Sequence, residues 1–250
     1  MIEDLKLFSG KRVLLTGDTG FKGSWLAYWL SMLGADVVGY ALPPEIHQRL
    51  FADLNLSSRI HHIDGDIRDE EKMLEVFSEF KPEIVFHLAA QPLVRYSYDE
   101  PKETFEVNVQ GSVNVLECVR KISSIKAFIY VTSDKCYQNN EWLWGYRETD
   151  HLGGKDPYSA SKGMAELVIR TYFESFFNMP SSNVRVGIAR AGNVIGGGDW
   201  ALDRIVPDCI NAWSRGEIVD IRNPRATRPW QHFPSNTLKS CRHRRRYRRR

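Results

Sequence analysis

The chain has 250 residues, of which 42% are hydrophobic and 26% charged, so it is long and apolar enough for one large domain, or one and a half average ones, with a packed core. No run approaches the roughly 18 consecutive apolar residues of a membrane span, and residues 1–10 mix acidic with apolar side chains, unlike a signal peptide; we therefore expect a cytoplasmic protein without a membrane partner. Eight of the 34 lysines and arginines lie in residues 239–250, so residues 1–238 hold 26 bases against 31 acids and the net charge of +3 comes from the tail.

Short β-branched runs alternate with longer helical patterns along residues 1–190. The runs are apolar throughout, which is typical of strands that are covered on both faces. Such alternation predicts an α/β fold with a doubly wound parallel sheet, the Rossmann arrangement. We expect strands at 12–16, 36–40, 59–63, 84–88, 127–132 and 184–189, and helices at 23–33, 69–80, 104–121, 158–177 and 202–215.

The pattern loosens near Asn193 into glycine-rich and proline-rich loops. We interpret residues 191–232 as the beginning of a smaller, incomplete lobe that binds substrate. Residues 233–250 show neither helical nor strand periodicity and are predicted to be a disordered basic tail. The four cysteines lie far apart and no histidine cluster accompanies them, so we expect free thiols in a reducing compartment and no metal site: Cys118, Cys136, Cys209 and Cys241.

A glycine-rich turn follows the first predicted strand. In this G-x-x-G-x-x-G pattern, Gly17 permits a tight turn, Gly20 lets the backbone approach a pyrophosphate, and Gly23 allows close helix packing. Three glycines alone are also common in plain turns, but this position after a first strand favours a dinucleotide site. The predicted cofactor-binding residues of the turn are Gly17, Thr19, Gly20, Phe21, Lys22 and Gly23.

The choice between NAD and NADP stays open on spacing alone. NAD-binding sheets usually carry an acid at the end of the second strand, whereas here the strand ends with Gly39 and Tyr40. No arginine stands there to hold a 2′-phosphate either. Asp66 and Ile67, just after the third strand, are predicted to contact the adenine, although Asp64 and Asp66 could equally be solvated turn residues.

Tyr158 and Lys162 are four residues apart at the start of a predicted helix, so both side chains lie on one face. An ammonium beside a tyrosine stabilises the phenolate, which would let Tyr158 accept a hydroxyl proton. The same spacing occurs by chance as a surface pair. Here it follows a strand that ends in Thr132 and Asp134, at the edge of the sheet where ligands bind.

Together these motifs resemble the extended short-chain dehydrogenase/reductase family, which includes NAD-dependent epimerases and dehydratases. The resemblance covers residues 8–232 and includes His87-Leu88-Ala89-Ala90 after the fourth strand. It implies bound NAD, with Leu88, Ala89 and Ala90 among its contacts. An acid after the Thr-Ser pair, here Asp134, is similar to nucleotide-sugar 4,6-dehydratases, and the following Lys135 is similar to their CDP-glucose branch.

The resemblance implies an internal redox dehydration of CDP-D-glucose to CDP-4-dehydro-6-deoxy-D-glucose, a step toward deoxyhexoses of bacterial surface polysaccharide. Tyr158 would remove the C4 hydroxyl proton, with Thr132 hydrogen-bonded to the C4 oxygen. Asp134 would be the acid at the C6 hydroxyl and Lys135 the base at C5. Lys135 acts as a base only when neutral, so a contact with substrate or phosphate is the alternative.

Substrate binding is expected from side chains in the later loops and after the fourth strand. Arg204 and Arg228 carry guanidinium groups that suit bidentate contacts with phosphate, although each could instead be a structural ion-pair partner. Asn108 is expected to be a structural hydrogen-bonder rather than a catalytic group. The predicted substrate-binding residues are Gln91, Arg95, Asn193, Arg204 and Arg228.

Two features depart from the resemblance. Asp18 places a carboxylate inside the glycine turn, where it should weaken pyrophosphate binding unless it points away or is paired. After His232 the resemblance ends together with the periodicity, and we hypothesise a change of reading frame there. Resequencing the coding DNA tests this hypothesis.

Several alternatives remain at this point. A sugar-nucleotide 4-epimerase or reductase would use the same Tyr158 and Lys162. A remnant that binds dinucleotide without turnover would follow from the shortened substrate lobe. The arginine tail could bind nucleic acid, but no aromatic platform or recognised binding fold accompanies it, so we expect no nucleic-acid partner. The resemblance also implies a homodimer through the helices at 104–121 and 158–177.

Overall fold

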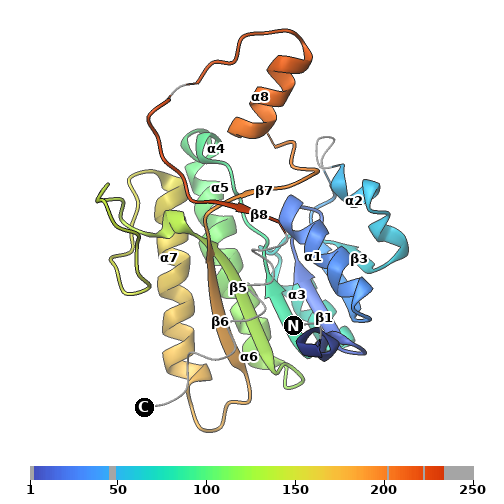
Figure 1. Ribbon diagram of the computed structural model, residues 1–250. Helices are drawn as coiled ribbons and strands as arrows, with labels where there is room; N and C mark the ends of the chain where they lie inside the picture. Colours follow the sequence, from blue (N-terminus) through green and yellow to red (C-terminus); the bar gives the residue numbers. More distant parts are fainter. Residues whose placement is uncertain (1–2, 45–48, 202, 222, 234–250) are drawn as a thin grey trace.

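A parallel sheet of six strands forms the centre of the chain (Figure 1). The computed structural model describes residues 3–44, 49–201, 203–221 and 223–233. The strand order is β3-β2-β1-β4-β5-β6, which is that of a Rossmann sheet and reverses between β1 and β4. The predicted doubly wound sheet is therefore confirmed. Its strands are β1 (Arg12–Thr16), β2 (Asp36–Ala41), β3 (His61–Asp64), β4 (Ile84–His87), β5 (Ala127–Ser133) and β6 (Arg185–Ala191).

Helices cover both faces of the sheet. α1 packs on one face, whereas α3, α6 and α7 pack together on the other. The helical elements are η1 (Glu3–Phe8), α1 (Phe21–Met32), α2 (Leu50–Asp53), η2 (Leu56–Ser58), α3 (Glu70–Phe80), α4 (Val94–Asp99), α5 (Pro101–Phe105), η3 (Glu106–Gln110), α6 (Gly111–Lys121), η4 (Asp134–Cys136), α7 (Pro157–Tyr172), η5 (Phe173–Phe177) and α8 (Ile205–Ser214).

The central strands β1 and β4 are largely apolar because both of their faces are buried, whereas the edge strands β3 and β6 are more exposed. In β1, Val13 and Leu15 pack with α1, while Leu14 between them packs with the helices of the other face. All three side chains are fully buried. Successive residues of a strand point to opposite faces, so a sheet that is covered twice needs apolar residues at every position.

Several predicted helix bounds were wrong. The helix expected at 104–121 begins at Pro101 and passes through a π-helical segment, η3, before α6. The helix expected at 158–177 has nearly these bounds, since α7 begins at Pro157, but its end is a second π-helical segment, η5. Apolar periodicity does not separate i→i+5 from i→i+4 hydrogen bonding. α8 begins at Ile205 rather than at residue 202, which lies outside the described residues, because Arg204 has an extended backbone.

A second, two-stranded parallel sheet follows the first and consists of β7 (Asn193–Ile195) and β8 (Trp230–His232). Figure 1 shows this pair and α8 beyond the carboxyl ends of the main strands. Phe233, which we assigned to the tail, is buried beside β8 and stacks on Trp25 at 5.4 Å between ring centroids. The predicted start of the tail was therefore wrong by one residue, because the Phe233 ring packs against apolar side chains of α1. Residues 234–250 lie outside the described residues.

Among the described residues, no helix is both long and apolar enough to cross a membrane. Cys118, Cys136 and Cys209 are free thiols, as predicted, and Cys241 lies outside the described residues.

Candidate active site

The expected ligand site lies where the strand order reverses, at the carboxyl ends of β1 and β4. Thr16 and His87 are register partners at these ends. The glycine turn leaves the sheet after β1, and η4, which carries Asp134 and Lys135, leaves it after β5. Parallel strands therefore bring both groups of predicted residues to one edge.

The glycine turn is shaped for close approach of a ligand. Gly17 has a φ of +79°, and a Cβ on it would lie 2.7 Å from the Ala89 nitrogen. A Cβ on Gly23 would lie 1.8 Å from the Gly17 carbonyl oxygen, so α1 packs directly on the turn. Gly20 is the N-cap of α1 and provides no side-chain cap. The first amide groups of α1 are thus left for an anion.

Three further predicted cofactor-binding residues, Thr19 of the turn and the pair that follows β3, contact neighbouring protein groups. The Thr19 hydroxyl donates to the Leu42 carbonyl at 3.0 Å. The Asp66 carboxylate accepts two hydrogen bonds from the guanidinium of Arg68, and these bonds outweigh desolvation and lower its pKa. Ile67 is buried in the core. All three side chains therefore contact other protein groups in this structure.

The loop after β4 is held against the glycine turn. The Thr16 hydroxyl accepts the backbone amides of Leu88 and Ala89, both at 3.2 Å, and pairs with His87 Nδ1 at 2.7 Å. Burial and the nearby charge of Lys162 lower the pKa of His87 to about 3. A neutral imidazole therefore supports the loop that carries Ala89 and Ala90.

α7 places Tyr158 and Lys162 at this edge. Asp156 caps the helix by accepting the Ser159 backbone amide at 2.9 Å, so Tyr158 lies in the first turn. Both predicted residues are almost fully buried, and the Lys162 Nζ lies 5.7 Å from the centroid of the Tyr158 ring. The i, i+4 spacing thus brings the two side chains together, as predicted.

The pKa values of this pair do not shift as we expected. Burial raises the pKa of Tyr158 above its ordinary value, and this effect exceeds the lowering by a hydrogen bond with Ser133 and by Arg204. Burial and the charge of Lys22 lower the pKa of Lys162 to about 7. Sequence reasoning considered only the charge pair, whereas desolvation dominates for both groups. Without a bound partner, Tyr158 is a neutral phenol.

Asp134 and Lys135 lie together after β5. The Lys135 Nζ and the Asp134 Oδ2 form an ion pair at 3.1 Å. Ser133 donates to Asp134 Oδ1 at 3.1 Å and accepts the Lys135 backbone amide at 3.2 Å. Ser133 also acts to lower the pKa of Tyr158, so it lies near both predicted catalytic pairs.

Thr132 faces the other way. Its hydroxyl donates to the buried Glu166 carboxylate, which also holds Arg190 through two hydrogen bonds of 2.9 Å. Consecutive strand residues point to opposite faces, so Ser133, rather than Thr132, presents its hydroxyl to Tyr158. Sequence reasoning missed Ser133 and Glu166. Strand alternation points to the first, and the second lies four residues after Lys162 on the same helix face.

The late loops reach the same edge through charged side chains. Arg204 forms an ion pair with Asp199 at 3.2 Å, the structural alternative that the sequence left open. Burial and the charge of Arg204 lower the pKa of Lys22 to about 8, against the opposing charges of Asp134 and Asp199. The glycine turn, η4 and the segment before α8 are therefore close enough to interact electrostatically.

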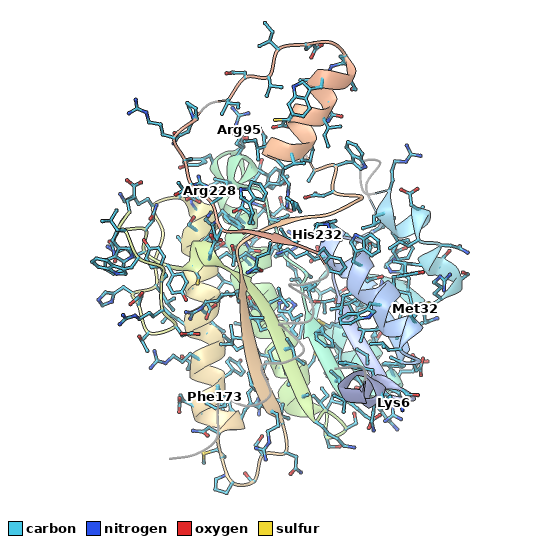
Figure 2. All side chains as sticks on the ribbon, viewed as in Figure 1. Lys6, Met32, Arg95, Phe173, Arg228 and His232 are labelled. Atoms are coloured by element: carbon cyan, nitrogen blue, oxygen red, sulfur yellow. The ribbon has the colours of Figure 1, made fainter. Side chains whose placement is uncertain are left out.

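The remaining predicted substrate-binding residues have protein partners in this structure. Arg95 forms an ion pair with Asp203 at 2.9 Å, and Arg228 donates to its neighbour's carbonyl, that of Thr227. Figure 2 shows both arginines on the side of the molecule that holds α8. Asn193 lies in β7.

Gln91 is bound within its own loop. Its side-chain amide donates to the Leu93 carbonyl and to the Thr104 hydroxyl. Asn108 bridges the Gln91 backbone and the Ser161 hydroxyl, so it has the structural role that we expected.

No group of three or more metal-ligating side chains is arranged to hold an ion in the described part of the chain.

The family model described as GDP-mannose 4,6 dehydratase matches residues 14–235. The CDP-glucose 4,6-dehydratase of Salmonella typhimurium is 54% identical to the chain over 232 residues. This similarity covers 92% of the chain but 65% of the Salmonella protein, so the chain spans just under two thirds of that relative.

Solved structures show the same fold. A UDP-glucose 4-epimerase of Thermotoga maritima, solved with UDP-glucose, superposes with a TM-score of 0.77 at 26% identity and covers 88% of this chain and 69% of that one. A dTDP-glucose 4,6-dehydratase of Streptomyces venezuelae, solved with NAD, has a TM-score of 0.78 at 22% identity, with 92% and 70% of the two chains covered.

Proposed function

The chain belongs to the GDP-mannose 4,6-dehydratase family, and from this membership we propose that it is an NAD-dependent nucleotide-sugar 4,6-dehydratase. We propose CDP-D-glucose as substrate and CDP-4-dehydro-6-deoxy-D-glucose as product, because the Salmonella relative is a CDP-glucose 4,6-dehydratase. The observation that carries the proposal is the position of Ser133, which hydrogen-bonds Asp134 and the Lys135 backbone and lies near enough to Tyr158 to affect its pKa. Redox and dehydration groups thereby share one site.

A dinucleotide fits the glycine turn. A Cβ on Gly20 would meet nothing closer than the Gly17 oxygen at 3.5 Å, so the turn leaves open space at the start of α1. We assign the pyrophosphate to the first amides of α1, beginning at Phe21, with Lys22 nearby as a cation. A dinucleotide held there would supply the hydride acceptor for C4 and the hydride donor for C6.

Tyr158 is the proposed base for the C4 hydroxyl. Its raised pKa keeps it protonated in the free protein, so its ionisation depends on positive charge around it. Lys162, with a pKa of about 7, gains a proton readily when a phenolate forms beside it. We assign to Ser133 the hydrogen bond to the C4 oxygen, the role that the resemblance implied for Thr132.

Asp134 and Lys135 are the proposed acid and base of the dehydration. One proton moves from Lys135 to Asp134 within their 3.1 Å contact and leaves a neutral amine and a protonated carboxyl group. The amine removes the C5 proton, which the C4 ketone has acidified, and the carboxyl group protonates the departing C6 hydroxyl. Water leaves, and the pair returns to its ionised form.

The diphosphate of the substrate is proposed to bind Arg204 and Arg95 in exchange for Asp199 and Asp203. Both arginines are already neutralised by these carboxylates, so binding replaces one anion by another. Asn193, Gln91 and Arg228 remain predicted contacts.

We propose a homodimer through α7 and its neighbouring helices. Met164, Leu167 and Phe176 are apolar residues of α7 and η5 that are 43–53% exposed, which favours a second copy as their cover. Light scattering of the wild type and of Leu167→Glu tests this, with a monomeric variant as the expected result. A wild-type monomer contradicts it.

The predicted cytoplasmic location agrees with the three free thiols.

The function is tested by incubating the protein with NAD and CDP-glucose and measuring the alkaline ultraviolet absorbance of the 4-keto product. UDP-glucose and dTDP-glucose are the substrate controls, and Tyr158→Phe is the matched variant. We expect product from CDP-glucose with the wild type alone. Conversion to a 4-epimer without a keto sugar would favour an epimerase, and NAD binding without any product would favour an inactive remnant.

A further inference from the structure

Asp18, the carboxylate inside the glycine turn, is wholly buried and lies against Gly39 of β2. Its Oδ2 accepts a hydrogen bond from His62 Nδ1 at 2.7 Å. The other ring nitrogen, Nε2, lies 3.1 Å from Asp64 Oδ1. The three side chains thus form one linear chain, the Asp18–His62–Asp64 chain.

The Asp18–His62–Asp64 chain lies over the carboxyl ends of β2 and β3. Gly39 is the register partner of His62, and Ala41 is the partner of Asp64. A Cβ on Gly39 would lie 2.2 Å from the Asp18 carboxyl carbon, so the glycine leaves space for this carboxylate alone. In a Rossmann sheet, this end of β2, beside the glycine turn, is where the adenosine ribose is read.

β2 itself carries no acid at that end, since it finishes with Gly39, Tyr40 and Ala41. The Asp18–His62–Asp64 chain brings carboxylates to the same place from the turn on one side and from β3 on the other. Asp18 Oδ1 is buried without a hydrogen-bond partner among the described residues. A buried carboxylate with one free oxygen retains an uncompensated negative potential.

The net charge of the Asp18–His62–Asp64 chain is negative whether His62 is protonated or neutral. With His62 protonated, two carboxylates and one imidazolium sum to −1, and with His62 neutral they sum to −2. The hydrogen bond with Asp18 is the main cause of a raised His62 pKa. No lysine or arginine within the described part of the chain forms an ion pair with Asp18 or Asp64.

We propose that the Asp18–His62–Asp64 chain makes this protein select a dinucleotide with a free ribose 2′-hydroxyl over one with a 2′-phosphate. This inference rests on the proposed dinucleotide-binding function and assigns its specificity to residues outside the usual β2 position. A 2′-phosphate adds a charge of about −1.5 to −2, which the net negative chain repels. A 2′-hydroxyl adds none.

The test is binding of NAD and of NADP to the whole protein, measured by calorimetry without substrate. We expect the wild type to bind NAD at least about tenfold more tightly than NADP at low salt. Asp64→Asn, at an exposed position, and Asp18→Asn should both narrow this ratio by strengthening NADP binding. Asp36→Asn, at the exposed amino end of β2, is the matched control and should leave the ratio unchanged.

The outcomes separate this inference from the proposed function. Equal affinities in the wild type, or an unchanged ratio in Asp64→Asn, would overturn the inference while dinucleotide binding stands. Asp64→Asn decides the matter if Asp18→Asn does not fold, because the Asp64 side chain is 64% exposed. Binding of neither dinucleotide would refute the proposed function and this inference together.

Discussion

Glu166 supports the candidate site from inside α7, and its replacement by glutamine should destabilise the whole protein. Its side chain is 1% exposed and pairs with Arg190, which is 17% exposed. The carboxylate accepts two guanidinium hydrogen bonds of 2.9 Å and the Thr132 hydroxyl. Glu166→Gln keeps the shape of the side chain but removes its charge, so the Arg190 guanidinium loses its counter-ion.

Breaking a buried ion pair on one side costs about 3–5 kcal/mol, because the remaining charge stays desolvated. Arg190 keeps a hydrogen bond to the Tyr137 hydroxyl at 2.8 Å and one to the Glu148 carbonyl at 3.1 Å. Its guanidinium also lies 4.7 Å from the centroid of the Tyr137 ring. We therefore expect the low end of the range, about 3 kcal/mol, which for a domain of this size lowers Tm by about 6–12 °C.

Urea unfolding followed by tryptophan fluorescence measures this loss. The control is Glu217→Gln, because Glu217 pairs with Arg215 where the two side chains are 54% and 62% exposed. An exposed pair contributes about 0–1 kcal/mol, so the control should unfold almost like the wild type. If Glu166→Gln lost no more stability than Glu217→Gln, the interpretation of Glu166 and Arg190 as a buried, desolvated pair would be refuted.

Lys162→Met should abolish product formation yet raise the free energy of unfolding by a few kcal/mol at pH 7, since burial lowers the pKa of Lys162 from 10.5 to about 7. Between these pH values the unfolded chain binds the extra proton, so the stability of the wild type rises with pH through this window. Urea titrations at pH 7 and 9.5 should therefore show a smaller difference in the free energy of unfolding between the wild type and the variant at the higher pH. A constant difference would contradict the assignment. Gly23→Ala should unfold the turn because its Cβ would lie 1.8 Å from the Gly17 oxygen, whereas Gly20→Ala should keep the fold, as thermal melting can show, but weaken NAD binding. Equal melting temperatures for the two variants would show that the close approach of α1 is not required.

Local sequence patterns were sufficient for the Rossmann sheet and for much of the site. β1 matches its predicted bounds, because its buried apolar run lies in a strand that is covered on both faces. The i, i+4 spacing of Tyr158 and Lys162 and the position of Asp134 after β5 likewise follow from helix and strand geometry. These relations span only a few residues, so they can be predicted from the periodicity of the sequence alone.

Tertiary structure decided the properties that depend on residues far apart in the chain. The sequence predicted that a charge pair would ionise Tyr158, but burial under other elements raises its pKa instead. Asp18 appeared as a misplaced charge in the turn until the fold brought His62, 44 residues away, within 2.7 Å. Desolvation and partner choice depend on what surrounds a group in space, and only the packed chain determines those surroundings.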